Sequence, residues 1–246
     1  MKRIGILLGL LTLATGLFLT ACRSHDSVTG ASPKADMSLP ERIEASTSKD
    51  GTGVNLSDAK IGVEGMKLLA DSPKVKNVVN LALKSNQLGK DGVKILAESP
   101  TFANVEKLSL QDNQVTAEGV QMIVDSAHFN QLKQLNLMKN QLGDDGVRAL
   151  VQSAKTDHLT WLDLSANRIT DAGAQAIANS EHLGNLKRLD LFRNQIGPEG
   201  IKAILQSPNL PNLEYLDFTA NAVAPDQIEA LEKAANLPNL KILIIQ

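Results

Sequence analysis

The residues most often used for chemistry are few in this chain of 246 residues. It has one cysteine, Cys22, and four histidines, at positions 25, 128, 158 and 182. One cysteine cannot form an internal disulfide, and the histidines lack the spacing of a metal site such as His-x-x-x-His. No Ser/His/Asp, Cys/His or paired-carboxylate constellation is visible, and the glycines do not cluster as in a phosphate-binding loop. The sequence therefore predicts no enzyme activity, no cofactor and no metal centre.

The composition is that of an ordinary folded protein. Hydrophobic residues make up 43% of the chain and charged residues 21%, and the net charge is −2. So much aliphatic content argues against disorder. A weakly acidic chain with no basic block gives no support for nucleic-acid binding.

Cys22 directly follows an apolar segment. Residues 4–19, about 16 in number, come after the cationic Met1-Lys2-Arg3 and are too few for a membrane helix of ~20 residues. The segment ends in Leu19-Thr20-Ala21-Cys22, which resembles the lipobox of bacterial lipoproteins. This resemblance implies that residues 1–21 are a cleaved signal peptide and that Cys22 carries acyl chains in the cell envelope. Arg23, in place of an aspartate, favours the outer membrane. The alternative is a plain secretory signal with an unrelated cysteine nearby.

Residues 22–50 predict a flexible tether behind the lipidated cysteine. The segment is rich in Ser, Thr, Ala, Lys and Asp, contains Pro33 and Pro40, and has little apolar periodicity. Such a segment cannot bury enough surface to offset its ordering entropy. Random-coil scaling gives it a reach of roughly 30 Å. Within it, residues 39–45 are expected to form a short helix that covers the start of the next domain.

The remaining residues, 51–246, repeat every 27 residues. Asparagine recurs at 86, 113, 140, 167, 194 and 221, and glycine at 65, 92, 119, 146, 173 and 200. Each asparagine belongs to the pattern L-x-x-L-x-L-x-x-N-x-L, complete over residues 186–196. This pattern resembles the leucine-rich repeat, and a 27-residue unit with an apolar helix resembles its ribonuclease-inhibitor-like class. The resemblance implies an α/β solenoid shaped like a horseshoe, which serves binding rather than catalysis.

Elementary geometry agrees with this architecture. Leu189 and Leu191 alternate with polar residues, as in a half-buried strand, and acidic residues such as Asp145 stand where helices begin. Parallel strands lie ~4.8 Å apart and packed helices ~8–10 Å apart, so the stack must curve with its parallel sheet on the concave face and its helices on the convex face. The asparagines are expected to satisfy buried backbone groups rather than to form a site.

The alternation places the third, fifth and seventh residues of each unit on the concave face. The first half of that face is small and polar, whereas the second carries Trp161, Arg188, Phe192 and Tyr215. Aromatic and arginine side chains dominate binding energy at protein interfaces. The sequence therefore predicts a patch here that binds a protein or peptide. The alternative is that Arg188 merely stacks between Trp161 and Tyr215.

The same half of the face carries a column of aspartates, Asp163, Asp190 and Asp217. Neighbouring carboxylates ~5 Å apart repel each other by ~1 kcal/mol in water, which Arg188 and Arg193 could offset. We expect the column to contribute to the binding patch by meeting a basic group of the partner. A bound cation is the less favoured interpretation.

The chain stops inside a repeat, at Leu240–Gln246. Ile242 and Ile244 should then stand on the concave face of an edge strand, which invites pairing with a second copy. The favoured function is a membrane-anchored lipoprotein that binds a protein or peptide, as an adhesin or an inhibitor does. The alternative is a structural or self-assembling envelope protein, associated for example with peptidoglycan.

Overall fold

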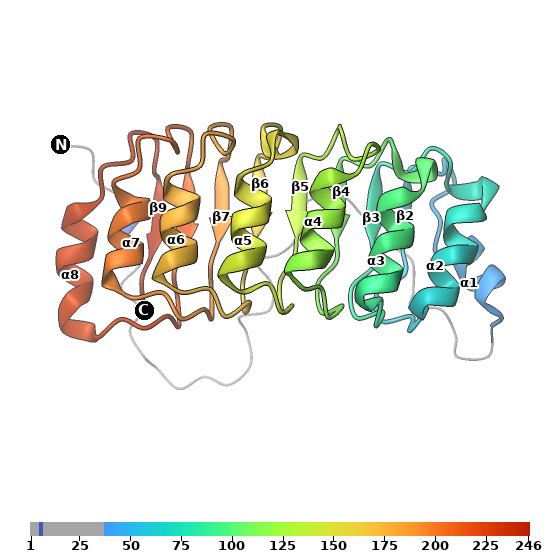
Figure 1. The fold of residues 1–246 in the computed structure, drawn as a ribbon, viewed down its shortest axis with the longest axis horizontal. Helices are drawn as coiled ribbons and strands as arrows, with labels where there is room; N and C mark the ends of the chain where they lie inside the picture. The colour runs from blue at the N-terminus through green and yellow to red at the C-terminus, as the bar shows by residue number, and fades with distance from the viewer. Residues whose placement is uncertain (1–4, 7–36) are drawn as a thin grey trace.

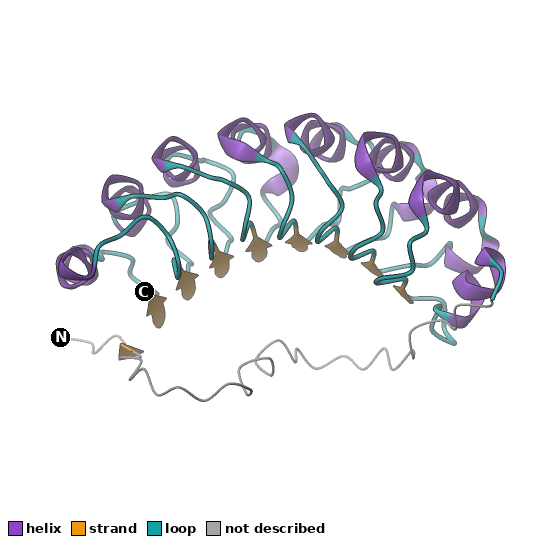
Figure 2. Ribbon diagram, turned by 90° about the horizontal axis from the view of Figure 1, so that it is seen from below, coloured by secondary structure: helices purple, strands orange, loops and turns teal. Residues whose placement is uncertain are grey.

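The computed structural model describes residues 5–6 and 37–246, which form a curved stack of strand–helix units (Figure 1). Figure 2 shows the strands along the inner arc and the helices along the outer arc. The strands are β1 (Gly5–Ile6), β2 (Gly53–Asn55), β3 (Asn80–Ala82), β4 (Lys107–Ser109), β5 (Gln134–Asn136), β6 (Trp161–Asp163), β7 (Arg188–Asp190), β8 (Tyr215–Asp217) and β9 (Ile242–Ile244). The helices are α1 (Leu39–Ala45), α2 (Gly62–Asp71), α3 (Gly89–Glu98), α4 (Ala117–Asp125), α5 (Gly143–Val151), α6 (Asp171–Ala178), α7 (Pro198–Leu205) and α8 (Pro225–Ala234).

The strands form one parallel sheet in the order β1-β9-β8-β7-β6-β5-β4-β3-β2. From β2 to β9 each strand residue pairs with the equivalent residue of the next repeat, as Leu162 does with Leu189 and Leu189 with Leu216. The predicted solenoid, with its parallel sheet on the concave face and its helices on the convex face, is confirmed.

One continuous core runs the length of the solenoid, from Ile43 to Ile245. The inward strand leucines are fully buried, and they meet helix residues such as Val147 and Leu150. Three phenylalanines, Phe102, Phe129 and Phe218, are among the largest side chains in this core. Every core residue that the structure describes lies beyond residue 42, so a chain that begins at Arg23 retains all of these residues.

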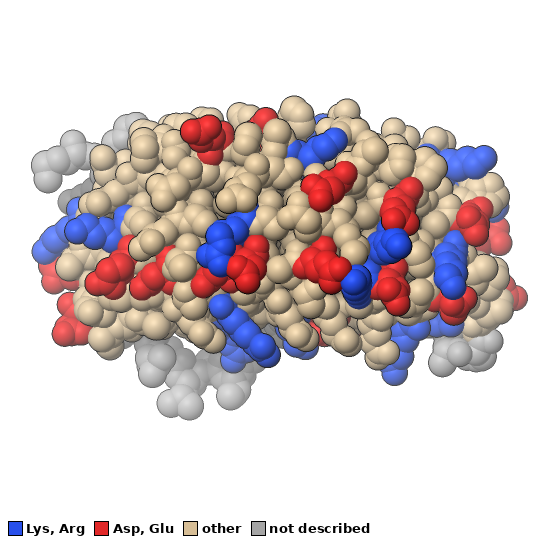
Figure 3. Space-filling model, in the orientation of Figure 1, with Lys and Arg blue, Asp and Glu red and all other residues tan. Residues whose placement is uncertain are grey.

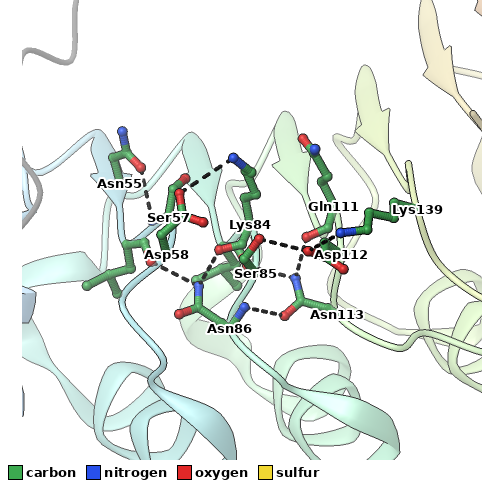
Figure 4. Close-up of polar contacts among 12 residues, drawn as sticks. Asn55, Ser57, Asp58, Lys84, Ser85, Asn86, Gln111, Asp112, Asn113 and Lys139 are labelled. Carbon is green, nitrogen blue, oxygen red and sulfur yellow. Dashed lines mark hydrogen bonds and ion pairs between the residues drawn. The ribbon is translucent and has the colours of Figure 1, made fainter.

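The asparagine column forms a ladder of buried amides along one edge of the sheet, as predicted (Figure 4). Asn86 donates through Nδ2 to the carbonyl oxygens of Leu56 and Lys84, and its Oδ1 accepts the amide of Ile61. The backbone amide of Asn86 in turn donates to Oδ1 of Asn113, at 2.9 Å. Each asparagine thus joins its own turn to the preceding repeat, so that backbone groups buried at the turn are satisfied.

The glycine column marks places where neighbouring helices approach closely. A Cβ atom on Gly146 would lie 2.9 Å from the Cβ of Leu142 and 3.3 Å from the Cα of Ala117 in the preceding repeat. Such contacts are shorter than van der Waals packing allows, so a side chain here would push the helices apart. The 27-residue recurrence of glycine therefore reflects helix packing.

The N-terminal end of the core is closed by α1, the short helix expected at residues 39–45. Ser38 and Glu41 form a capping box at its start, and Ile43 is buried against the first repeat. Arg42 donates to the carbonyl oxygen of Ala59, at 2.8 Å. The short helix α1 thus packs against the first repeat, as expected for residues 39–45. Burial of Ile43 offsets the entropy of ordering this segment, which the segment's average composition does not reveal.

At the other end, Leu243 and Ile245 face the core and Ile242 is 44% exposed, as expected for this strand. The outer edge of β9 pairs with β1, through Gly5↔Ile242 and Ile6↔Leu243. These two residues lie within residues 1–21, the predicted signal peptide. Cys22 and the tether up to residue 36 lie outside the described residues. Within the part that the structure describes, no helix is long and apolar enough to cross a membrane.

The asparagine ladder makes a direct prediction about stability. Asn167 donates to the carbonyl oxygens of Leu137, Leu164 and Ser165. Asn167→Ala leaves these buried oxygens without that donor and should destabilise the fold by ~2–4 kcal/mol. Urea unfolding measures this change. Arg168→Ala is the matched control, because the neighbouring residue is exposed and its loss should cost below ~0.5 kcal/mol. Equal unfolding midpoints for the two variants would contradict the structural role of the ladder.

Candidate functional site

The structure brings Trp161, Arg188 and Tyr215 together on adjacent strands of the concave face. Their Cα atoms are paired across β6, β7 and β8, and all three side chains are half-buried. The guanidinium carbon of Arg188 lies 4.1 Å from the centre of the Tyr215 ring, a cation–π contact. The stacking that the sequence offered as an alternative is thus present on the Tyr215 side.

Asp190 links the other members of this group. Its Oδ2 accepts hydrogen bonds from Nε1 of Trp161 at 3.1 Å and from Nε of Arg188 at 2.8 Å, and its Oδ1 accepts one from Nη2 of Arg188 at 3.0 Å. Asp190 is only 7% exposed, so these bonds form in a site of low dielectric, where they are strong. We call Trp161, Arg188, Asp190 and Tyr215 the concave cluster. Its carboxylate holds the indole and the guanidinium in place.

Asp163, on the neighbouring strand, is 9% exposed, and its Oδ1 accepts the backbone amide of Ser165 at 2.9 Å. Burial raises the pKa of this carboxyl to about 6, and the negative charge of Asp190 acts in the same direction. The hydrogen bonds from Ser165 and the charge of Arg188 oppose the rise in pKa. Asp163 is therefore a buried acid whose ionised form is disfavoured in the folded chain.

The other members of the aspartate column show a local structural role. Oδ1 of Asp217 accepts the amide of Thr219 at 2.8 Å, just as Oδ1 of Asn136 accepts the amide of Met138 at 2.9 Å. This bond closes the turn that leaves each strand. Since Asp163 and Asp190 are buried, Asp217 is the member of the column that a partner could reach directly.

Phe192 lies half-buried one turn beyond β7, and the guanidinium carbon of Arg193 is 5.5 Å from the centre of its ring. It extends the apolar area next to the concave cluster. Among the described residues, no group of three or more His, Cys, Asp or Glu side chains could hold a metal ion. What the cluster offers chemically is stacking, apolar contact and a fixed pattern of charge.

The sequence did not single out a hollow of about 280 Å³ over β2–β6, the first half of the concave face. Asn80, Gln134 and Asn136 are among its lining residues, and Trp161 stands at its end. The sequence could not indicate this hollow, because small polar residues at solvent-facing positions look the same in a binding site and on an ordinary surface. By contrast, the convex face in Figure 3 carries Lys and Arg interspersed with Asp and Glu, as in the ion pair of Lys90 with Glu118.

Comparisons with known proteins bear on the repeat. A family model described as leucine-rich repeat matches residues 103–124, 130–151, 157–178 and 182–205. Comparison with curated proteins gives no match. Leucine-rich-repeat domains generally mediate interactions between proteins, and they are typically not enzymes.

Among solved structures, the leucine-rich-repeat protein LIC12759 of Leptospira interrogans is 25% identical over 70% of this chain, with a TM-score of 0.42. This chain spans 38% of the length of that one. Internalin C2 of Listeria monocytogenes is 20% identical, with 79% of this chain and 80% of that chain covered and a TM-score of 0.49. The C-terminal domain of tropomodulin from Caenorhabditis elegans is 18% identical, with 53% and 82% covered and a TM-score of 0.43.

The raised pKa of Asp163 predicts a pH-dependent stability. A free aspartate titrates near 3.8, so between about pH 4 and pH 6 the folded chain binds more protons than the unfolded one at this site. The contribution of Asp163 to stability is therefore full below pH 4 and is lost as the pH rises through 6. Asp163→Asn keeps the acceptor for Ser165, as Asn136 does for Met138 in the preceding repeat.

The variant should match the wild type near pH 4 and exceed its stability at pH 8 by ~1–3 kcal/mol, as measured by urea unfolding at both pH values. If the free energies of unfolding of the variant and the wild type differ by the same amount at both pH values, the pKa of Asp163 is not raised in the folded state.

Proposed function

We propose that this leucine-rich-repeat solenoid is the binding domain of a membrane-anchored envelope lipoprotein and holds a protein or peptide on its concave face over β6–β8. One observation carries the proposal. Of the six aromatic residues among the described residues beyond position 36, three phenylalanines fill the core, whereas Trp161, Phe192 and Tyr215 lie half-buried on three successive repeats. Core packing does not account for that placement.

The concave cluster is suited to binding because it is held in place by contacts within the chain. Asp190 and the Tyr215 ring already fix the Arg188 side chain, and Asp190 fixes the Trp161 ring. A partner therefore meets side chains that lose little further entropy on binding. Asp190 balances the charge of Arg188, and Asp217 stands next to them. This arrangement favours a partner that presents an apolar side chain with a basic group near it. The solenoid would bind such a partner as an adhesin or an inhibitor.

The anchor follows from the lipobox-like sequence at Cys22. Several acyl chains on one cysteine, at ~0.8 kcal/mol per buried CH₂, give stable attachment where one chain would be marginal. About 16 residues, most of them outside the described part of the chain, separate Cys22 from α1. If they form the proposed flexible tether, random-coil scaling gives it a reach of roughly 20–25 Å. The solenoid would then work close to the surface of the outer membrane.

A structural or self-assembling envelope protein is the second candidate. The observation in its favour is β9, which carries the 44% exposed Ile242 and would lose its outer neighbour β1 on removal of residues 1–21. An edge strand with apolar residues on both faces can pair with a strand of a second copy. This candidate needs no soluble partner.

The concave cluster is tested by truncating its aromatic residues. The binding partner is first recovered from envelope extract with the wild-type solenoid, and its affinity is then measured by calorimetry. Trp161→Ala and Tyr215→Ala should each weaken it by about fivefold to a hundredfold, and stability should fall by less than ~2 kcal/mol. Leu68→Ala is the control, because Leu68 is a 45% exposed side chain on the convex helix α2. Unchanged affinity together with a sharp loss of stability would make both residues structural.

Removal of the acceptor thiol tests the lipid anchor. Cys22→Ala should leave the solenoid folded and release it from membranes, and labelled fatty acid should appear on the wild type alone. Detergent-phase partitioning reports the anchor directly. If both proteins partition equally, Cys22 is not lipidated.

The edge strand is tested in a chain that begins at Arg23, by sedimentation at micromolar concentration. Self-assembly predicts a dimer that Ile244→Lys dissociates, since a buried ammonium at the edge is costly. The matched control is Lys241→Ala, a neighbour on the same edge that is already exposed. A wild-type monomer would reject the second candidate.

A further inference from the structure

The hollow over β2–β6 differs in chemistry from the concave cluster. Two rows of side chains cross it from strand to strand, and all of them are half-buried. The rows are Asn80, Lys107, Gln134 and Trp161, and Asn55, Ala82, Ser109 and Asn136. Five strands ~4.8 Å apart make the hollow roughly 20 Å long, so a ligand that fills it is extended.

The amides in this hollow offer hydrogen bonds that no described residue uses. Oδ1 of Asn80 is buried and accepts no hydrogen bond from any described residue. Oδ1 of Asn55 and of Asn136 each accept a backbone amide at the turn, which leaves their Nδ2 groups as donors toward the hollow. A buried acceptor without a donor costs free energy, which an O–H or N–H group of a ligand would recover.

The apolar surface that a ligand can reach lies at one end of the hollow. Leu81 and Leu108 face the core and are only 1% and 2% exposed, whereas the half-buried Trp161 ring bounds the far end. Among the described residues that line the hollow, none carries a carboxylate and Lys107 is the one charged residue. The remaining polar groups are amides and a hydroxyl, which pair with neutral polar groups of a ligand.

We propose that this hollow binds a neutral, extended β-linked oligosaccharide. Sugar hydroxyls both donate and accept, as the amides do, and the C–H face of a pyranose ring can pack on the indole of Trp161. A β-linked chain forms a flat ribbon that can lie across the strands. The site lies beside the proposed partner site and shares Trp161 with it, whereas its amide residues belong to the hollow alone.

Titration of the chain beginning at Arg23 tests the site, with cellohexaose and chitohexaose as probes. Trp161 is the only tryptophan of the chain, so its fluorescence reports the end of the hollow. At least one probe should give a saturable change, and Asn80→Ala and Gln134→Ala should each weaken binding about fivefold or more, the loss expected for one hydrogen bond. Tyr215 is not among the residues that line the hollow, so Tyr215→Ala should leave saccharide binding unchanged.

Melting of each variant is measured in parallel, so that a loss of folding is not taken for a loss of binding. The proposal is overturned if neither probe binds, if binding survives both amide substitutions, or if a neutral octapeptide binds there and the saccharides do not. If these titrations fail, the proposed role of the concave cluster in partner binding is not affected, because that role is tested separately with Tyr215→Ala.

Discussion

The buried asparagine in each turn is the interaction on which the rest of the structure depends. It joins three backbone groups from two successive repeats, as Asn86 does for Leu56, Ile61 and Lys84, and it meets the next asparagine through its own amide. The ladder therefore fixes the register of each repeat on its neighbour. A slip of one residue would turn every strand leucine from the core to the solvent, so register and burial support each other.

Register in turn creates the concave surface. Because equivalent residues pair across all strands from β2 to β9, each outward position of the repeat becomes a column that runs along the solenoid. The columns are free to change in chemistry without any change in the fold. Here they are amide-rich over β2–β5 and aromatic over β6–β8, so one scaffold presents two surfaces of different kind. Trp161 lies where they meet.

The sequence predicted the period, the curved parallel sheet and the role of the asparagines, because these depend on patterns that recur every 27 residues. It also placed Trp161, Arg188 and Tyr215 on one face, since strand alternation decides that. It did not predict that Asp190 turns toward Arg188 and Trp161, or that Asp163 is buried. The direction of a short carboxylate depends on its cross-strand neighbours, and those contacts have no signature within a single repeat. The packing of α1 follows from one buried residue, Ile43, in a segment of polar composition.

The central claim is that the protein itself fixes the concave cluster, through Asp190, as a ready surface for a partner. The indole N–H of Trp161 tests this claim most directly, because it is the only such resonance in the chain. In the chain beginning at Arg23, heteronuclear NMR should find this proton protected from exchange with water, and Asp190→Ala should abolish the protection and shift the resonance. The same change at Asp217, one strand away, should leave the protection intact. Free exchange of the indole proton in the wild type, or protection that is unchanged in Asp190→Ala, would show that Asp190 does not fix the concave cluster.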